Sequence, residues 1–167
     1  MKTKNQYSLP LDKEHIKHQT SESPAHRKYI SGNAEYDLTH AVDFLCENET
    51  PVNVALEGKV VHVQDGITKN WNKSEVPPKE FMSEDEQDGN YVVLEHDKGE
   101  LSIYSHLKPG NINVRQGDEV KTGDLLGYIG HTGWSIKPHL HFMVFKFTKQ
   151  KPAKDFESLE INWREAK

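Results

Sequence analysis

Several features that decide the class of a protein are scarce or absent in this chain. Cys46 is the only cysteine among 167 residues, so no disulfide forms within the chain. No stretch approaches the ~18 consecutive apolar residues of a membrane-spanning helix, and residues 1–8 lack the apolar core of a signal peptide. The sequence therefore predicts no transmembrane segment, and either a cytoplasmic protein or one whose export signal has been removed.

Positive charge is also in short supply. The 21 Lys and Arg residues are outnumbered by 26 Asp and Glu residues, which gives a net charge of -5 and a sequence pI near 6.0. No stripe of Lys and Arg stands out that would attract a phosphate backbone. Nucleic acid is therefore not an expected partner.

The chain does contain many short segments rich in Val, Ile, Tyr and Phe, separated by glycine-containing turns. The strands expected from them are residues 41–45, 52–55, 58–64, 91–95, 101–105, 125–129, 140–147 and 160–163. No segment shows a convincing helical pattern. Such a series is typical of an all-β domain, so we expect a mostly antiparallel sandwich or partly open barrel with long loops.

Two parts of the chain interrupt this pattern. Residues 1–35 are polar and are expected to be irregular, which leaves residues 36–167 for the β domain. Within that domain, residues 66–90 contain the pair Pro77-Pro78 and the acidic run Glu84-Asp85-Glu86. A segment of this composition buries little apolar surface, so we expect a long hairpin insertion that walls a groove or is merely solvated.

The chemistry is concentrated in a few histidines and one acid. His139 and His141 are two residues apart in an expected strand, so both side chains point to the same face. His106 ends another expected strand, and Asp43 lies between apolar neighbours in a third. A carboxylate in such a strand is costly to bury unless it is paired or binds a metal.

These residues lie in segments that resemble the lysostaphin-type, or LytM-type, zinc endopeptidases. The resemblance covers about 100 residues in the family's order. It runs through residues 43–44, 49–55, 58–61, 89–96, 104–107, 117–120, 123–124, 132–135 and 138–142. So many matched segments make coincidence improbable.

The resemblance implies a role for each residue. Asp43 and His141 correspond to zinc ligands, and His106 and His139 to the two histidines that assist catalysis. Three protein ligands leave a fourth position on zinc for a water molecule, which is activated for attack on a peptide carbonyl. We therefore expect one zinc ion per chain and a metallopeptidase domain in residues 36–167.

The third ligand departs from the family pattern, because Thr39 occupies the usual place of the first histidine. His40 is near in sequence, but in an extended strand it would point to the face opposite Asp43 unless a bulge intervened. His26 lies in the N-terminal segment, at the place where a subgroup of the family has its upstream histidine. We favour His26, which requires the segment 1–35 to pack on or over the site, and keep His40 as the alternative.

The resulting hypothesis is a zinc metalloendopeptidase that cleaves peptidoglycan cross-links outside the cytoplasm. The competing hypothesis is a LytM-like binding or regulatory module with little or no activity, which the threonine at position 39 favours. Met143, where many relatives have a glutamate, also puts efficiency in question. Residues 117–127 resemble lipoyl and biotinyl carrier domains as well, but Lys121 lacks the flanking residues of a carrier lysine.

Overall fold

The computed structural model describes residues 1–31, 34–75, 84–148 and 155–165. Its strands are β1 (His18–Thr20), β2 (Lys28–Ser31), β3 (Ala34–Asp37), β4 (Val42–Leu45), β5 (Pro51–Asn53), β6 (Gly58–Gln64), β7 (Asn70–Trp71), β8 (Asn90–Glu95), β9 (Leu101–Leu107), β10 (Glu119–Val120), β11 (Leu125–Tyr128), β12 (Gly133–Trp134), β13 (His139–Phe147) and β14 (Phe156–Ser158). The helical elements are α1 (Glu84–Asp88) and two 3-10 turns, Lys13–His15 and Asp97–Gly99.

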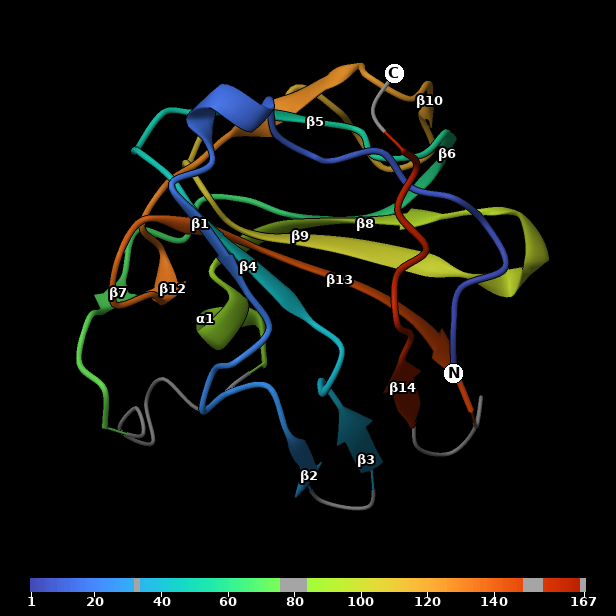
Figure 1. The fold of residues 1–167 in the computed structure, drawn as a ribbon. Helices are drawn as coiled ribbons and strands as arrows, with labels where there is room; N and C mark the ends of the chain where they lie inside the picture. The colour runs from blue at the N-terminus through green and yellow to red at the C-terminus, as the bar shows by residue number, and fades with distance from the viewer. Residues whose placement is uncertain (32–33, 76–83, 149–154, 166–167) are drawn as a thin grey trace.

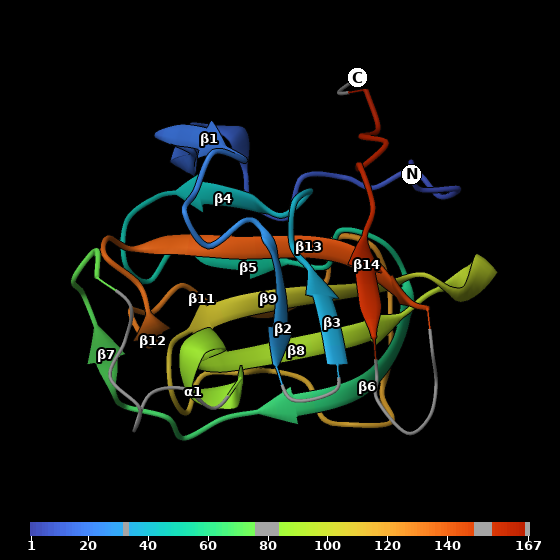
Figure 2. The ribbon, with the colours of Figure 1, turned by 90° about the horizontal axis from the view of Figure 1, so that it is seen from below.

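One ten-stranded sheet organises the molecule. Its order is β10-β6-β8-β9-β13-β14-β3-β2, and β4 pairs with both β13 and β1. Every pairing in this sheet is antiparallel except that of β14 with β3. The long strands β8, β9 and β13 form its centre (Figure 1). In Figure 2 these strands run across the picture, whereas β2, β3 and β14 stand nearly upright. The expected all-β, mostly antiparallel and unclosed fold is confirmed.

The two faces of the central strands contact different parts of the molecule, because side chains alternate along a strand. Leu140, Phe142 and Val144 of β13 point into the main hydrophobic core. Met143 and Phe145 belong to a smaller buried cluster with Ala41, Val93 and Ile103. His139 and His141 lie on the same face of β13 as that smaller cluster, because they share its odd-numbered register. The histidine pair therefore lies on a strand whose opposite face packs in the main hydrophobic core.

The segment 1–35 is less irregular than expected. It contains β1, β2 and the start of β3, and its side chains Tyr7 and Leu11 are buried in the main core. Tyr7 makes an isolated parallel bridge to Trp163. These strands were missed because β1 and β2 are only three and four residues long and exist through pairing with distant segments.

Two further expectations require correction. Residues 160–163 do not form a strand: they make only isolated bridges to the N-terminal segment, and the pairing strand is β14. The insertion at 66–90 contains the short strand β7, which pairs in parallel with β12, and the one-turn helix α1. Its described flanks therefore do not pair with each other as a hairpin. Pro77 and Pro78 lie outside the described residues.

No helix in the described part of the chain has the length and apolar character needed to cross a membrane.

Candidate metal centre and active site

Three side chains with metal-binding atoms meet on one face of the sheet. Asp43 on β4 lies directly opposite His141 on β13. Thr20, at the end of β1, lies opposite Asp43 on the other side of β4. The chain then leaves β1 and returns six residues later, so that His26 reaches the same place from the β1–β2 loop. The strand register thus brings together residues that are 17 and 98 positions from Asp43 in sequence.

The donor atoms are spaced as a metal site requires. His26 Nε2 lies 3.2 Å and His141 Nδ1 lies 3.0 Å from Asp43 Oδ1, and the two nitrogens are 3.3 Å apart. A tetrahedral zinc with bonds of about 2.0–2.1 Å separates its ligand atoms by about 3.3 Å. Two imidazoles and a carboxylate with this spacing fit zinc without rearrangement. They are the only group of three potential ligands within 4.8 Å in the described parts of the chain.

The hydrogen bonds around His26 favour metal binding through its Nε2 atom. Its Nδ1 atom lies 2.9 Å from the backbone carbonyl oxygen of Ser21, to which Nδ1–H can donate. This bond fixes the tautomer in which the Nε2 lone pair faces Asp43. The side chain is buried, so water does not compete for that lone pair. Ser21 gave no signal in the sequence, because any residue can supply a backbone carbonyl.

Asp43 carries its charge despite being largely buried. Burial alone would raise the pKa of this carboxyl, but the hydrogen bond with His141, the contact with the His26 imidazole and nearby imidazole charge hold it far below its ordinary value. Burial lowers the pKa of His141, whereas the hydrogen bond to Asp43 and the charges of Asp43 and Asp88 outweigh it and raise that pKa. The site therefore offers an ionised carboxylate among imidazoles.

His106 and His139 lie beside this group. Their ring centroids are 4.6 Å apart, and His139 Nε2 lies 3.8 Å from Asp43 Oδ1. The Nδ1 atoms face backbone carbonyls, that of Thr132 at 2.8 Å from His106 and that of Lys137 at 2.7 Å from His139. Burial, with the charge of neighbouring imidazoles, lowers the pKa of both rings. Both are therefore neutral imidazoles at pH 7 whose Nε2 lone pairs can accept a proton.

His106 reaches the site through an unusual backbone conformation. In a regular strand Ser105 and His106 would point to opposite faces. His106 has φ +66°, in the left-handed region, and the residue after it, Leu107, turns into the main core. The kink brings the His106 ring to 6.0 Å from that of His141. Such a conformation costs a non-glycine residue roughly 1–2 kcal/mol, so the surrounding structure enforces it.

His40 is not part of the group. It lies with Thr39 in a turn before β4, and its backbone N–H donates to Ser158 Oγ at 2.9 Å. The Thr39 hydroxyl donates to Asp37 Oδ1 at 2.6 Å. The expected extended strand at His40 is wrong, because β4 begins only at Val42. The structure places His26, and not His40, beside Asp43 and His141.

The five candidate residues line one cavity of about 290 Å³. The rest of its wall is formed by Ser23, Pro24, Ala25, Leu45, Ser74, Trp134, Ile136 and Lys137. Ser74 comes from the insertion that was expected to wall a groove. Trp134 and Ile136 were not singled out as wall residues from the sequence, since an apolar side chain in a two-residue strand or in a loop gives no sign of the cavity it faces.

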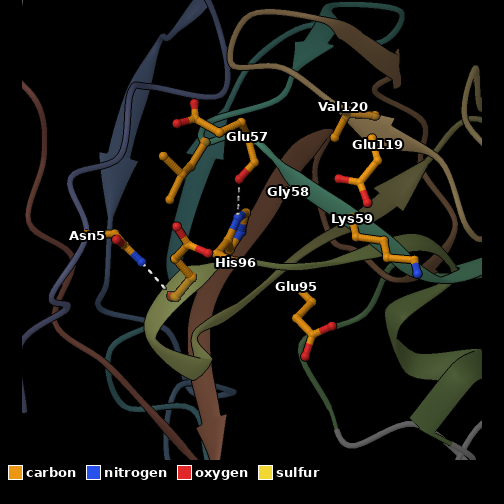
Figure 3. Close-up of a pocket in the computed structure, with 10 residues that line it drawn as sticks. Asn5, Glu57, Gly58, Lys59, Glu95, His96, Glu119 and Val120 are labelled. Atoms are coloured by element: carbon orange, nitrogen blue, oxygen red, sulfur yellow. Dashed lines mark hydrogen bonds between the residues drawn. The ribbon is translucent and has the colours of Figure 1, made fainter.

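A second cavity, of about 390 Å³, lies where β6 and β10 meet the turn between β8 and β9 (Figure 3). Its one histidine, His96, is already hydrogen-bonded at both ring nitrogens, to the Glu57 carbonyl and to Ser102 Oγ, each at 2.8 Å. Burial lowers the pKa of this ring. The cavity is larger than that of the candidate site, but its histidine has no nitrogen left for a ligand.

Several known proteins are similar to this chain in sequence. Glycyl-glycine endopeptidase ALE-1 of Staphylococcus capitis is 33% identical over 113 residues, which are 68% of this chain and 25% of ALE-1. Lysostaphin of Staphylococcus simulans is 33% identical over 122 residues, 71% of this chain and 20% of lysostaphin. The chain thus spans about a quarter or less of these relatives.

A solved structure and a family profile agree with them. The crystal structure of a zinc-containing peptidase from Vibrio cholerae superposes with a TM-score of 0.57 at 27% identity, covering 84% of this chain and 36% of that one. Residues 37–154 match the profile of Peptidase family M23, which contains Asp43, His106, His139 and His141 but begins after His26. The resemblance to lysostaphin-type enzymes is therefore confirmed, and the chain belongs to peptidase family M23.

Proposed function

We propose that the chain is a zinc metalloendopeptidase that hydrolyses peptide bonds in peptidoglycan cross-links. His26, Asp43 and His141 would hold one zinc ion, and His106 and His139 would assist the hydrolysis. The observation that carries the proposal is the triangle of donor atoms at 3.0–3.3 Å beside two neutral imidazoles in one cavity. In this proposal the segment 1–35 packs over the site and supplies a ligand to the metallopeptidase domain of residues 36–167.

The residues divide the chemistry between them. A bound zinc ion supplies an activated water and polarises the carbonyl to be attacked. His106 and His139 each present an Nε2 lone pair, because their Nδ1 atoms face backbone carbonyls. One of these imidazoles takes a proton from the attacking water at Nε2 and then gives it to the leaving amine.

The same geometry limits how the other imidazole stabilises the oxyanion. A hydrogen bond to the oxyanion requires a proton on Nε2, and the Nδ1 contacts leave that atom without one in the neutral ring. The second histidine can therefore donate only when it is protonated or has changed tautomer. The buried environment disfavours the protonated form in the resting site, so we expect proton transfer to be the main task of this pair.

The substrate rests on similarity. ALE-1 is named a glycyl-glycine endopeptidase, and the lysostaphin-type family cleaves short cross-links of small residues in peptidoglycan. A cavity of about 290 Å³ with Trp134 and Ile136 in its wall is compatible with a peptide of small residues. Because peptidoglycan lies outside the cytoplasm, we place the protein there, in the periplasm, at the cell surface or in the medium.

The test uses the purified chain loaded with one equivalent of zinc. We expect it to release soluble fragments from peptidoglycan and to cleave a glycine-rich or cross-link peptide, with activity lost after chelation and restored by zinc. Products are identified by mass spectrometry, which also shows the cleaved bond. A matched control is the zinc-loaded His139→Ala variant, which would keep the metal but lack one imidazole.

The binding-module alternative makes a different prediction. Thr39 favours it only if no other residue replaces the missing histidine, and His26 lies 3.2 Å from Asp43 in the required place. If the wild-type chain carries full zinc and binds peptidoglycan without cleaving any peptide, the enzymatic proposal is wrong and the alternative stands.

The choice of third ligand can be tested by comparing His26→Ala with His40→Ala. Loss of a direct ligand should weaken zinc binding by more than the 10–100-fold that is typical of residues around a ligand. We expect this for His26→Ala and a near wild-type zinc affinity for His40→Ala, measured by competition with a chelator of known affinity. The reverse result, with zinc lost only in His40→Ala, contradicts the ligand set.

A further inference from the structure

A second carboxylate, that of Asp88, contacts Ser105, the residue opposite His141 on the side away from Asp43. Strands β4, β13 and β9 place Asp43, His141 and Ser105 directly opposite one another, in one row across three strands. Side chains in such a row point to the same face, with neighbouring Cβ atoms about 4.5–5.5 Å apart. The Ser105 hydroxyl donates to Asp88 Oδ1 at 3.0 Å. Asp88 therefore reaches this row at Ser105, the cross-strand neighbour of His141.

The position of Asp88 is fixed by close backbone packing. Asp88 ends α1, and the next residue, Gly89, has φ +68°. A Cβ on Gly89 would lie 2.4 Å from Thr132 Oγ1, and one on Gly133 would lie 2.3 Å from the Gln87 carbonyl oxygen. Only glycine at both positions allows α1 to approach β12 this closely. The carboxylate is thus carried on backbone that has little room to move.

The ring of His141 has one nitrogen left for such a partner. Its Nδ1 atom faces Asp43 and belongs to the donor triangle. Nε2 lies on the other edge of the imidazole, and the buried side chain has little access to water. The charge of Asp88 acts on this ring. A histidine that binds a metal through one nitrogen commonly donates its other N–H to a carboxylate, which fixes the tautomer and raises ligand basicity.

We propose that Asp88 is a positioning residue for the metal site. Its carboxylate would accept a hydrogen bond from His141 Nε2–H and hold Nδ1 as the ligand atom, while Ser105 keeps the carboxylate in place. The inference rests on the proposed function, because it concerns a metal held by His141. If Asp88 has this role, the insertion at 66–90 lines the cavity through Ser74 and also orients the proposed zinc ligand His141 through α1.

The experiment measures zinc affinity in Asp88→Asn and in a matched control on the same helix, Glu86→Gln. Glu86 pairs with Lys69 at 2.8 Å, so its substitution perturbs α1 without altering the row of β4, β13 and β9. We expect Asp88→Asn to weaken zinc binding 10–100-fold. Glu86→Gln should stay within twofold of wild type. Ser105→Ala should weaken binding less than Asp88→Asn, and Asp88→Glu should recover part of the loss.

The melting temperature of the metal-free protein separates positioning from folding. A purely structural role would lower it in Asp88→Asn while leaving the affinity of the folded protein unchanged, and that result overturns the inference. Equal affinity loss in Glu86→Gln would overturn it too. If Asp88→Asn does not fold, the inference is tested by the zinc affinities of Ser105→Ala and Asp88→Glu, and wild-type affinity in both variants overturns it. Wild-type protein that binds no zinc overturns both proposals, whereas full wild-type affinity retained in Asp88→Asn overturns only this one.

Discussion

Substitution of His141 by alanine is expected to abolish stoichiometric zinc binding. His141 Nδ1 is one corner of the donor triangle, and its removal leaves one imidazole and one carboxylate. A catalytic zinc site normally has three protein ligands, so the two that remain are not enough to hold the ion tightly. Elemental analysis of the purified variant should therefore show well under one zinc per chain, against one in the wild type.

The melting temperature should provide an independent measure of zinc binding. A ligand that binds only the folded state at 100 times its dissociation constant stabilises it by about 2.7 kcal/mol. We expect added zinc to raise the melting temperature of the wild type but not that of His141→Ala. His62→Ala is a suitable control, because His62 lies exposed on β6, where its ring stacks on Tyr91 with centroids 5.3 Å apart.

The alanine variant also deprives the Asp43 carboxylate of a hydrogen bond, and an unpaired buried charge destabilises a fold. His141→Gln retains a polar side chain and provides a second test if the alanine variant is poorly folded. Full zinc retention in either folded variant would show that the metal, if any, is held elsewhere.

Substitution of the two other histidines should separate zinc binding from hydrolysis. We expect His106→Asn and His139→Ala to retain one zinc per chain and to lose about 10²–10⁴-fold in turnover, the usual contribution of a positioned proton-transfer group. Neither residue belongs to the donor triangle, and both rings lie beside it. The rate is measured with a cross-link peptide at saturating concentration, and the zinc content in the same preparation.

The choice of asparagine at position 106 follows from the backbone. With φ +66°, alanine would be strained there, whereas asparagine tolerates the left-handed conformation. A loss of activity in His106→Asn then reports the missing imidazole and not a refolded strand. Turnover within a few-fold of wild type in both variants, with zinc present, would assign the proton transfer to another group.

The part of the site that lies on β13 could be predicted from sequence, because one segment contains the necessary information. His139 and His141 share a face through the two-residue period of a strand, and the structure places both at the cavity. Asp43 stood out for a similar reason, as a charged side chain in an apolar alternation. The all-β class also followed from local pattern, since short β-branched and aromatic segments with glycine turns exclude most other architectures.

Other parts depended on contacts between distant segments. His26 lies near Asp43 because β1 pairs with β4 and the following loop turns back, and neither the pairing nor the loop path is written in the local sequence. His106 faces the site because its own backbone adopts the left-handed conformation, which the alternation of side chains along a strand does not predict. The error at residues 160–163 has the same origin, because a segment of alternating polar and apolar residues becomes a strand only if the edge of another strand is available to pair with it.

The fold class and the family could be predicted from the amino-acid sequence alone, and so could four of the five candidate site residues: Asp43, His106, His139 and His141. Periodicity is a property of one short segment, so it can be interpreted without knowing the rest of the molecule. Only the folded chain shows that His26 completes the donor triangle and that Asp88 contacts Ser105, the residue opposite His141. Those choices depend on strand register and on the close packing of α1 against β12, which exist only once segments far apart in the chain have met.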